Sequence, residues 1–282
     1  MGSGLTTAYD QDTLRSVIRE WKAEGLRTAL VPTMGALHDG HLELVRRGVQ
    51  IADRVVVTVF VNPKQFAANE DLDKYPNDIS ADKTMLESVG ADLVYVPNND
   101  EMYPTGFSCV VSLKGPASVG LEDKYRPQFF DGVTTVVAKL FNQASCDYAM
   151  FGEKDFQQLA VVSQMVRDLN IATTIVPVET VREPSGLAMA SRNAYLSKKE
   201  LALAPSIYNF AKQTAANIND GMNPKEAADA TAQKLTDLGF RVDYVEARNA
   251  NTLDYVKNNN EPMRILTAAW LGKTRLIDNI GV

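Results

Sequence analysis

The sequence predicts an α/β fold in which a doubly wound parallel sheet is followed by a smaller α+β domain. In the first 180 residues, apolar runs rich in β-branched residues alternate with segments of helical periodicity. One of these runs, VVVTVFV at 55–61, is apolar throughout, as expected of a strand buried on both faces of a sheet. We therefore expect a Rossmann-like domain over residues 1–180 and a smaller domain over residues 181–282.

Strands and helices alternate along the first domain. The expected strands are the apolar runs at 28–32, 55–61, 92–96, 148–151 and 173–178. The expected helices are the segments at 41–52, 79–89, 132–144 and 155–169. Gly90 and Asn170, which follow two of these segments, are residues that commonly end helices.

The pattern changes after Arg182, where polar helical segments replace the alternation. Two helices are expected at 198–219 and 224–238, and the second begins at Pro224 and ends before Gly239. Short strands are expected at 241–247, 264–270 and 274–280.

The composition of the 282-residue chain limits its class of function. The chain is 45% hydrophobic and 23% charged, as in ordinary globular proteins, and its net charge of -6 argues against a nucleic-acid partner. No apolar stretch approaches the roughly 20 residues of a membrane span. Cys109 and Cys146 form no CxxC pair and favour a reducing compartment. We expect a cytoplasmic enzyme with small-molecule substrates and no membrane partner.

The only two histidines, His38 and His41, follow the first expected strand in MGALHDGHLELV at 34–45. At a spacing of three they project to the same side of a helix start, where free N–H groups and the helix dipole attract anions. Gly35 and Gly40 allow close approach of a nucleotide to the backbone. Capping histidines without a ligand are one alternative. A zinc site is another, but no third His or Cys ligand lies nearby. A phosphate site with two imidazole donors is the preferred interpretation.

Polar residues follow two further strands. Asn62 and Gln65 come after the run at 55–61 and are expected at the carboxyl edge of the sheet, where open α/β sheets bind ligands. Lys154 and Asp155 follow the run at 148–151, where a lysine can supply a compact cation to phosphates. Taken alone, GEKD is more often a charged capping turn.

A third phosphate-binding candidate begins the second domain. Arg192 can direct two donors onto phosphate oxygens, and Ser191 can add a hydroxyl. Because these residues and His41 fall in different domains, domain closure could complete the site and exclude water. We place the hinge of that closure at 178–186.

Segments along nearly the whole chain resemble the pantothenate synthetase family, the pantoate-beta-alanine ligases, within the HxGH nucleotidylyltransferase superfamily. The segments are VPTMGALHDGH at 31–41, VFVNPKQF at 59–66, FGEKDFQQL at 151–159, LAMASRN at 187–193 and AAWLGKTRLIDN at 268–279. The resemblance implies that ATP and pantoate form a pantoyl adenylate and pyrophosphate, and that β-alanine then displaces AMP. It also implies Mg²⁺ with ATP, and a homodimer. The alternatives are a related nucleotidylyltransferase that retains the nucleotide in its product, and a nucleotide-binding module without turnover.

The resemblance also implies residue roles. His38 and His41 are expected at the bridge between the α and β phosphates, Lys154 at the α phosphate, and Ser191 with Arg192 at the β and γ phosphates. Further ATP contacts are expected from Met34, Gly35, Gly40, Asn62, Gly152, Asp155, Val181 and Met189. Pantoate contacts are expected from Gln65, Gln158, Met34 and Val136.

Three of these expectations have structural alternatives. Gln65, taken alone, is more often a satisfied loop amide. Met34 could form an apolar pocket with Val133, Val136 and Val137, or these valines could belong to the helix core. Asp82 could be a magnesium ligand or an exposed carboxylate on a helix surface.

The chain departs from the family pattern at three positions. Phe129 stands where the family has a histidine, Asp131 stands where a basic residue is common, and Ala190 replaces the first of two serines. Because the groups suited to the chemical step are present, we expect these departures to alter affinity.

Overall fold

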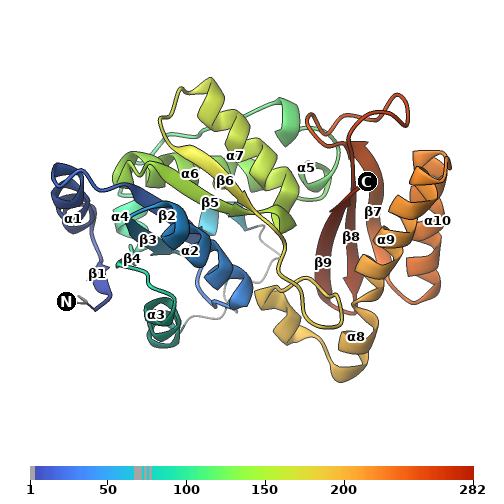
Figure 1. Ribbon diagram of the computed structural model, residues 1–282, viewed down its shortest axis with the longest axis horizontal. Helices are drawn as coiled ribbons and strands as arrows, with labels where there is room; N and C mark the ends of the chain where they lie inside the picture. Colours follow the sequence, from blue (N-terminus) through green and yellow to red (C-terminus); the bar gives the residue numbers. More distant parts are fainter. Residues whose placement is uncertain (1–3, 67–71, 73–74, 76–77) are drawn as a thin grey trace.

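The computed structural model describes residues 4–66, 72, 75 and 78–282, and it contains two separate sheets (Figure 1). The first sheet has six parallel strands in the order β1-β4-β3-β2-β5-β6. The strands are β1 (Thr6–Ala8), β2 (Thr28–Thr33), β3 (Arg54–Val59), β4 (Leu93–Tyr95), β5 (Tyr148–Gly152) and β6 (Thr174–Val178). The predicted doubly wound parallel sheet is confirmed.

The order of the strands reverses at β2. From β2 the chain continues outward to β3 and β4, and then returns to place β5 on the opposite side of β2. In open α/β sheets, ligands bind in the crevice outside the carboxyl ends of the strands at such a reversal. The segments that follow β2 and β5 are MGALHDGH and EKD, so the fold itself brings the two histidines and Lys154 to one edge.

Helices cover both faces of this sheet because alternate strand residues point to opposite sides. Leu30 and Val56 face a core shared with α1 (Gln11–Ala23), α6 (Phe129–Ala144) and α7 (Phe156–Asp168). Val31 and Val57 face a second core shared with α2 (Asp39–Ile51) and α3 (Ile79–Ser88). The continuous valine run is thus explained by burial on both sides.

The second sheet is antiparallel, in the order β7-β8-β9, and is formed by β7 (Arg241–Asn249), β8 (Met263–Leu271) and β9 (Thr274–Gly281). One face packs against α9 (Ser206–Asn219) and α10 (Pro224–Asp237). Its other face contacts Phe156 and Ala160 of α7 and Leu121, next to α5 (Glu122–Tyr125). The smaller domain therefore rests directly on the first.

The structure differs from the sequence prediction in two local respects. β1 and α1 precede the first predicted strand. The segment predicted as one helix at 198–219 forms α8 (Lys198–Leu203) and α9, which begins after Pro205. Proline lacks the N–H group that a continuous helix would need at this point. Within the described residues, the remaining elements are α4 (Asn99–Met102) and the short 3-10 helices η1 (Pro63–Gln65), η3 (Gly115–Ala117), η4 (Glu153–Asp155) and η5 (Ser191–Tyr195).

Among the described residues, no helix combines the length and the apolar character that crossing a bilayer requires.

Candidate active site

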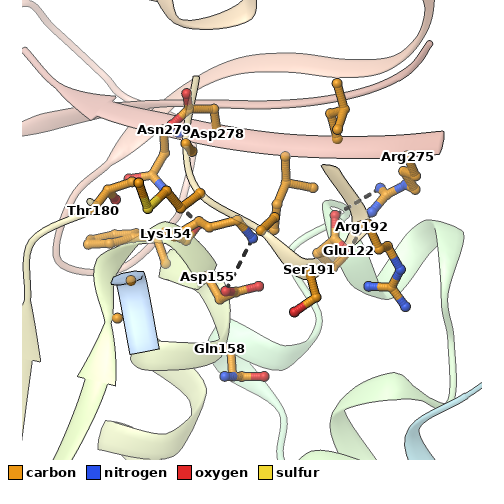
Figure 2. A pocket seen from close by; sticks show the side chains of 18 of the residues that line it. Glu122, Lys154, Asp155, Gln158, Thr180, Ser191, Arg192, Arg275, Asp278 and Asn279 are labelled. Atoms are coloured by element: carbon orange, nitrogen blue, oxygen red, sulfur yellow. Dashed lines mark hydrogen bonds and ion pairs between the residues drawn. The ribbon is translucent and has the colours of Figure 1, made fainter. Parts of the chain in front are cut away.

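A cleft of about 690 Å³ lies where the carboxyl ends of β2 and β5 face the second sheet. Both domains line it, and its size is in the range of small-molecule and cofactor sites. Figure 2 shows Lys154, Asp155 and Gln158 from the first domain with Ser191, Arg192 and Asn279 from the second around this cleft.

The two histidines lie at the first turn of α2. His38 is the N-cap, and its Nδ1 accepts the Gly40 N–H at 3.1 Å. A neutral imidazole that accepts at Nδ1 carries its proton on Nε2, so His38 retains one N–H donor. A Cβ atom on residue 40 would lie 2.8 Å from the His38 ring, which explains the glycine. The His41 ring lies beside that of His38, with centroids 4.1 Å apart.

Burial keeps both imidazoles neutral. Burial, followed by the positive charge of Lys154, lowers the pKa of His38 to about 4. Burial, followed by repulsion from His38 and Lys154, lowers the pKa of His41 to about 3. The His41 Nδ1 is buried without a hydrogen-bond partner in the described part of the chain. The site therefore presents two neutral groups beside a lysine at a helix N-terminus, an arrangement suited to binding phosphate oxygens.

The turn that carries Lys154 is held by the second domain. Asn279 of β9 donates from Nδ2 to the Glu153 carbonyl at 2.9 Å and to the Lys154 carbonyl at 2.8 Å. Arg264 of β8 donates to the Glu153 carboxylate at 2.7 Å. The Lys154 Nζ lies 3.5 Å from the Asp155 carboxylate. The position of the lysine in the first domain thus depends on side chains of the second.

The segment that connects the domains also lines the cleft. Arg182 forms two hydrogen bonds to the Asp278 carboxylate, at 2.7 and 2.8 Å, and so fixes the start of this segment on β9. The Ser191 hydroxyl donates to the Ala36 carbonyl at 3.1 Å and so joins the segment to the histidine loop. Arg192 follows in η5 and lines the cleft.

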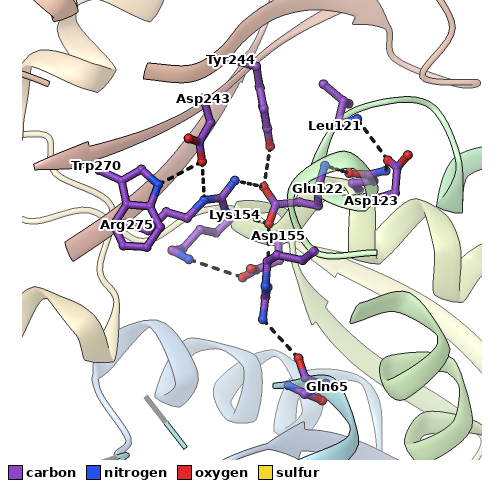
Figure 3. A network of polar contacts seen from close by, with 12 residues as sticks. Gln65, Leu121, Glu122, Asp123, Lys154, Asp155, Asp243, Tyr244, Trp270 and Arg275 are labelled. Atoms are coloured by element: carbon purple, nitrogen blue, oxygen red, sulfur yellow. Dashed lines mark hydrogen bonds and ion pairs between the residues drawn. The ribbon is translucent and has the colours of Figure 1, made fainter. Parts of the chain in front are cut away.

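A buried network of charges joins the domains at one end of the cleft (Figure 3). Glu122, which is 6% exposed, accepts two hydrogen bonds from Arg275 at 2.8 Å and one from the Tyr244 hydroxyl at 2.8 Å. Arg275 also donates to Asp243 at 2.8 Å. Burial alone would lower the pKa of Arg275, but the hydrogen bonds and charge of Glu122, assisted by Asp243, raise it instead. The guanidinium therefore stays charged and paired.

Most of the predicted site residues line the cleft. They are Met34, His38, Gly40, His41, Gly152, Lys154, Asp155, Gln158, Val181, Met189, Ser191 and Arg192. Gly35, Asn62, Gln65 and Val136 are not among the lining residues.

Asn62 and Gln65 connect η1 to its surroundings. Asn62 is 1% exposed, and its amide donates to the Gly132 carbonyl and the Gln65 side chain. Its oxygen accepts from the Tyr103 hydroxyl and the Lys64 N–H. These four bonds use the full capacity of the amide, so an ATP contact by Asn62 would require the exchange of one of them. The Gln65 amide lies 2.9 Å from the Met34 sulfur, next to the cleft.

The predicted apolar pocket for pantoate is present only in part. Met34 lines the cleft, whereas Val133, Val136 and Val137 are buried in the core between α6 and the sheet. Their burial agrees with the alternative interpretation of these valines as core residues. Helical periodicity alone does not distinguish a face that meets a ligand from one that meets a sheet.

Asp82 does not occupy the exposed position that was one of its two predicted settings. The expectation of an exposed carboxylate is wrong, because Asp82 is 3% exposed and accepts the N–H groups of Ala36 and Leu37. Within the described ranges, no group of three His, Cys, Asp or Glu side chains could hold a metal ion. The described residues therefore offer Asp82 no set of partner ligands for a metal site.

Several cleft residues were missed by the sequence analysis, among them Glu122, Tyr244, Arg275 and Asn279. For Asn279 the sequence did contain a signal, because the strand expected at 274–280 includes two successive polar residues in its segment LIDN. Phe129, at the position where a histidine was expected, packs against the guanidinium of Arg126 at 3.7 Å from its ring centroid.

Comparisons with known proteins agree over nearly the whole chain. A sequence model described as Pantoate-beta-alanine ligase matches residues 6–281. Pantothenate synthetase from Rhodopseudomonas palustris is 51% identical over 270 residues, and that from Caulobacter vibrioides is 52% identical over 273 residues, each covering 95% of both chains.

Solved structures extend this agreement to the fold. Pantothenate synthetase from Thermus thermophilus superposes with a TM-score of 0.92 at 40% identity and covers 98% of this chain and 99% of its own. Pantoate-beta-alanine ligase from Francisella tularensis, solved with β,γ-ATP and β-alanine, has a TM-score of 0.84 at 32% identity and covers 99% of this chain and 98% of its own.

The neutral histidines give a first prediction. Neither imidazole should titrate between about pH 8 and pH 5, although an unperturbed histidine titrates near 6.5. Histidine NMR spectra will test this without ambiguity, because the chain has only two. Bound ATP should raise both pKa values, because its negative charge favours imidazolium. A histidine that titrates near pH 6.5 without ligand would contradict the prediction.

The same pKa shifts link stability to pH. The unfolded chain takes up protons at both histidines near pH 6.5, whereas the native state does so only near 4 and 3. Stability should therefore fall as the pH falls through this window. Replacing both histidines with glutamine should flatten the pH dependence of the urea midpoint between pH 6.5 and 4.

The buried charge network gives a prediction about stability. Glu122→Gln should reduce the free energy of unfolding by about 3 kcal/mol, because it removes one of the two charged partners of a buried arginine and leaves only Asp243. Asp229→Asn is the matched control, because it breaks an exposed pair with Lys225 and should cost less than about 0.5 kcal/mol. Urea denaturation measures the free energy of unfolding of both variants. Equal losses would show that the buried network stabilises the fold no more than an exposed ion pair does.

Proposed function

The chain belongs to the pantoate-beta-alanine ligase family and uses ATP to join pantoate to β-alanine, and we propose how the residues of the cleft carry out this reaction. The observation that carries the proposal is the meeting of His38, His41 and Lys154 at the point where the sheet order reverses. ATP would place its phosphates there, against the N-terminus of α2.

In the first step a pantoate carboxylate oxygen attacks the α phosphorus, and the bond to the α-β bridging oxygen breaks. Negative charge grows on that bridge and on the α-phosphate oxygens. His38 and His41 stabilise the bridge, and Lys154 stabilises the α phosphate. Donors fixed in place before the reaction act most strongly in a buried site, because they need no reorganisation as charge develops.

Ser191 and Arg192 contact the β and γ oxygens from the second domain. Arginine can offer two parallel donors to phosphate, and the Ser191 hydroxyl already points at the histidine loop. The alanine at position 190 removes one hydroxyl from this contact, so its expected effect is weaker phosphate binding.

Pantoate occupies the part of the cleft next to Met34. Gln158 lines the cleft, and the Gln65 amide lies 2.9 Å from the sulfur of Met34, which also lines it. We assign both amides to the hydroxyl groups of the acid, which Gln65 would reach by exchanging its contact with Met34. In the second step the β-alanine amine attacks the acyl carbon, AMP leaves with the electron pair, and the nitrogen releases a proton. Exclusion of water by both domains would protect the adenylate from hydrolysis in between.

We also propose that Mg²⁺ accompanies ATP and that the enzyme works as a cytoplasmic homodimer. In the described residues, the lack of a carboxylate cluster suits an ion held mainly by phosphate oxygens and water. Such an ion would neutralise phosphate charge. Both cysteines are free, which suits a reducing compartment.

Product analysis tests the function directly. Pyrophosphate should appear with ATP and pantoate alone, whereas AMP and pantothenate should accumulate only when β-alanine is added. Each substrate is omitted in turn from a coupled assay. A product that retains the nucleotide would identify a nucleotidylyltransferase instead.

His41→Ala tests the proposed mechanism. Loss of one preorganised donor should lower the rate of adenylate formation by about 10² to 10³, and ATP affinity should change much less. His41→Asn is the matched variant, because its amide can restore one N–H donor. Single-turnover pyrophosphate release gives the rate, and a near-normal rate in His41→Ala would remove this histidine from the mechanism.

A further inference from the structure

The loop that carries both histidines is held by a carboxylate outside the cleft. The Asp82 Oδ2 accepts the Ala36 N–H at 3.1 Å, and its Oδ1 accepts the Leu37 N–H at 2.9 Å. Two successive N–H groups that converge on one anion form a backbone nest. Helix α3 thereby holds the connection between β2 and α2.

The conformation of this loop requires such support. Gly35 has φ +83°, and Ala36 has φ +51°. A left-handed alanine costs about 1 kcal/mol or more, so its surroundings must maintain it. A Cβ atom at residue 35 would lie 3.0 Å from the Asp82 Oδ2, which shows how closely the carboxylate fits the loop.

Ala36 also contacts the second domain. Its N–H donates to Asp82, and its carbonyl accepts the Ser191 hydroxyl at 3.1 Å. One residue therefore connects the buried carboxylate, the histidine loop and the segment that carries Arg192. A change in the loop would move both sides of the phosphate site.

We propose that Asp82 is a positioning residue of the adenylation site. It holds residues 35–37 in the conformation that places His38 and His41 at the start of α2 and presents the Ala36 carbonyl to Ser191. The proposal rests on the function proposed above for the imidazoles. Asp82 acts through the backbone and contacts neither ATP nor pantoate.

Asp82→Asn is the test, because it preserves shape but replaces one acceptor oxygen with an NH₂ group that cannot accept the loop N–H. We expect kcat to fall about tenfold or more, and KM for ATP to change by less than about threefold. The NMR resonances of both histidines should shift in the ligand-free protein. Asp78→Asn, at the exposed N-cap of the same helix, should match the wild type, because asparagine caps helices equally well.

Three results would overturn the proposal. They are a kcat within twofold of that of Asp78→Asn, unchanged histidine resonances, and recovery of activity at raised Mg²⁺, which would identify Asp82 as a metal ligand. If Asp82→Asn does not fold, Gly35→Ala provides the second variant, because its Cβ would push the loop away from the intact carboxylate. Unchanged histidine resonances in Gly35→Ala would also count against the proposal.

The NMR spectra of the histidines are recorded on the ligand-free protein, so they report on the loop whether or not the enzyme is active. An inactive wild-type protein would therefore contradict the proposed function, whereas an active wild type with an unaffected Asp82→Asn variant would contradict only the role of Asp82.

Discussion

The buried pairing of Glu122 with Arg275 is the interaction on which the arrangement of the cleft depends. The two residues belong to different domains, and each loses its hydration where they meet. A buried charge is tolerated only with a partner in good geometry, so this pair favours one orientation of the second sheet over others. That orientation also lets Asn279 reach the Lys154 turn and Ser191 reach Ala36. The geometry of the active site thus depends on the Glu122–Arg275 contact at its edge.

Neutral histidines suit a site that must accept a highly charged substrate. Protonated imidazoles beside Lys154 would repel each other and the lysine in the empty protein, and burial would add to that cost. Neutral rings avoid this penalty and still offer N–H groups to phosphate. When phosphates arrive, their charge favours a proton on the same rings. In the mechanism that we propose, this change in protonation would strengthen the electrostatic support as negative charge grows on the α-β bridge.

The sequence was most informative where structure and chemistry are local. The fold follows from valine runs that need burial on both faces, and the histidine site follows from a strand, two glycines and a helix start within a short segment. Contacts between distant residues left no such signal. Asn279 meets Lys154 across 125 positions, and Arg275 meets Glu122 across 153. No periodicity indicates such pairs, because they depend on how the domains pack.

The same contacts restrict how the cleft can admit ATP. A hinge at 178–186 was predicted for closure of one domain on the other, and that closure stays a prediction. Rotation about this segment would have to retain the Glu122–Arg275 pair, because separating buried charges costs several kcal/mol. Ser191 and Ala36 are joined by one hydrogen bond of a hydroxyl, worth about 1 kcal/mol. We therefore expect any opening of the cleft to separate the segment around Ser191 from the histidine loop and to keep the buried charges paired.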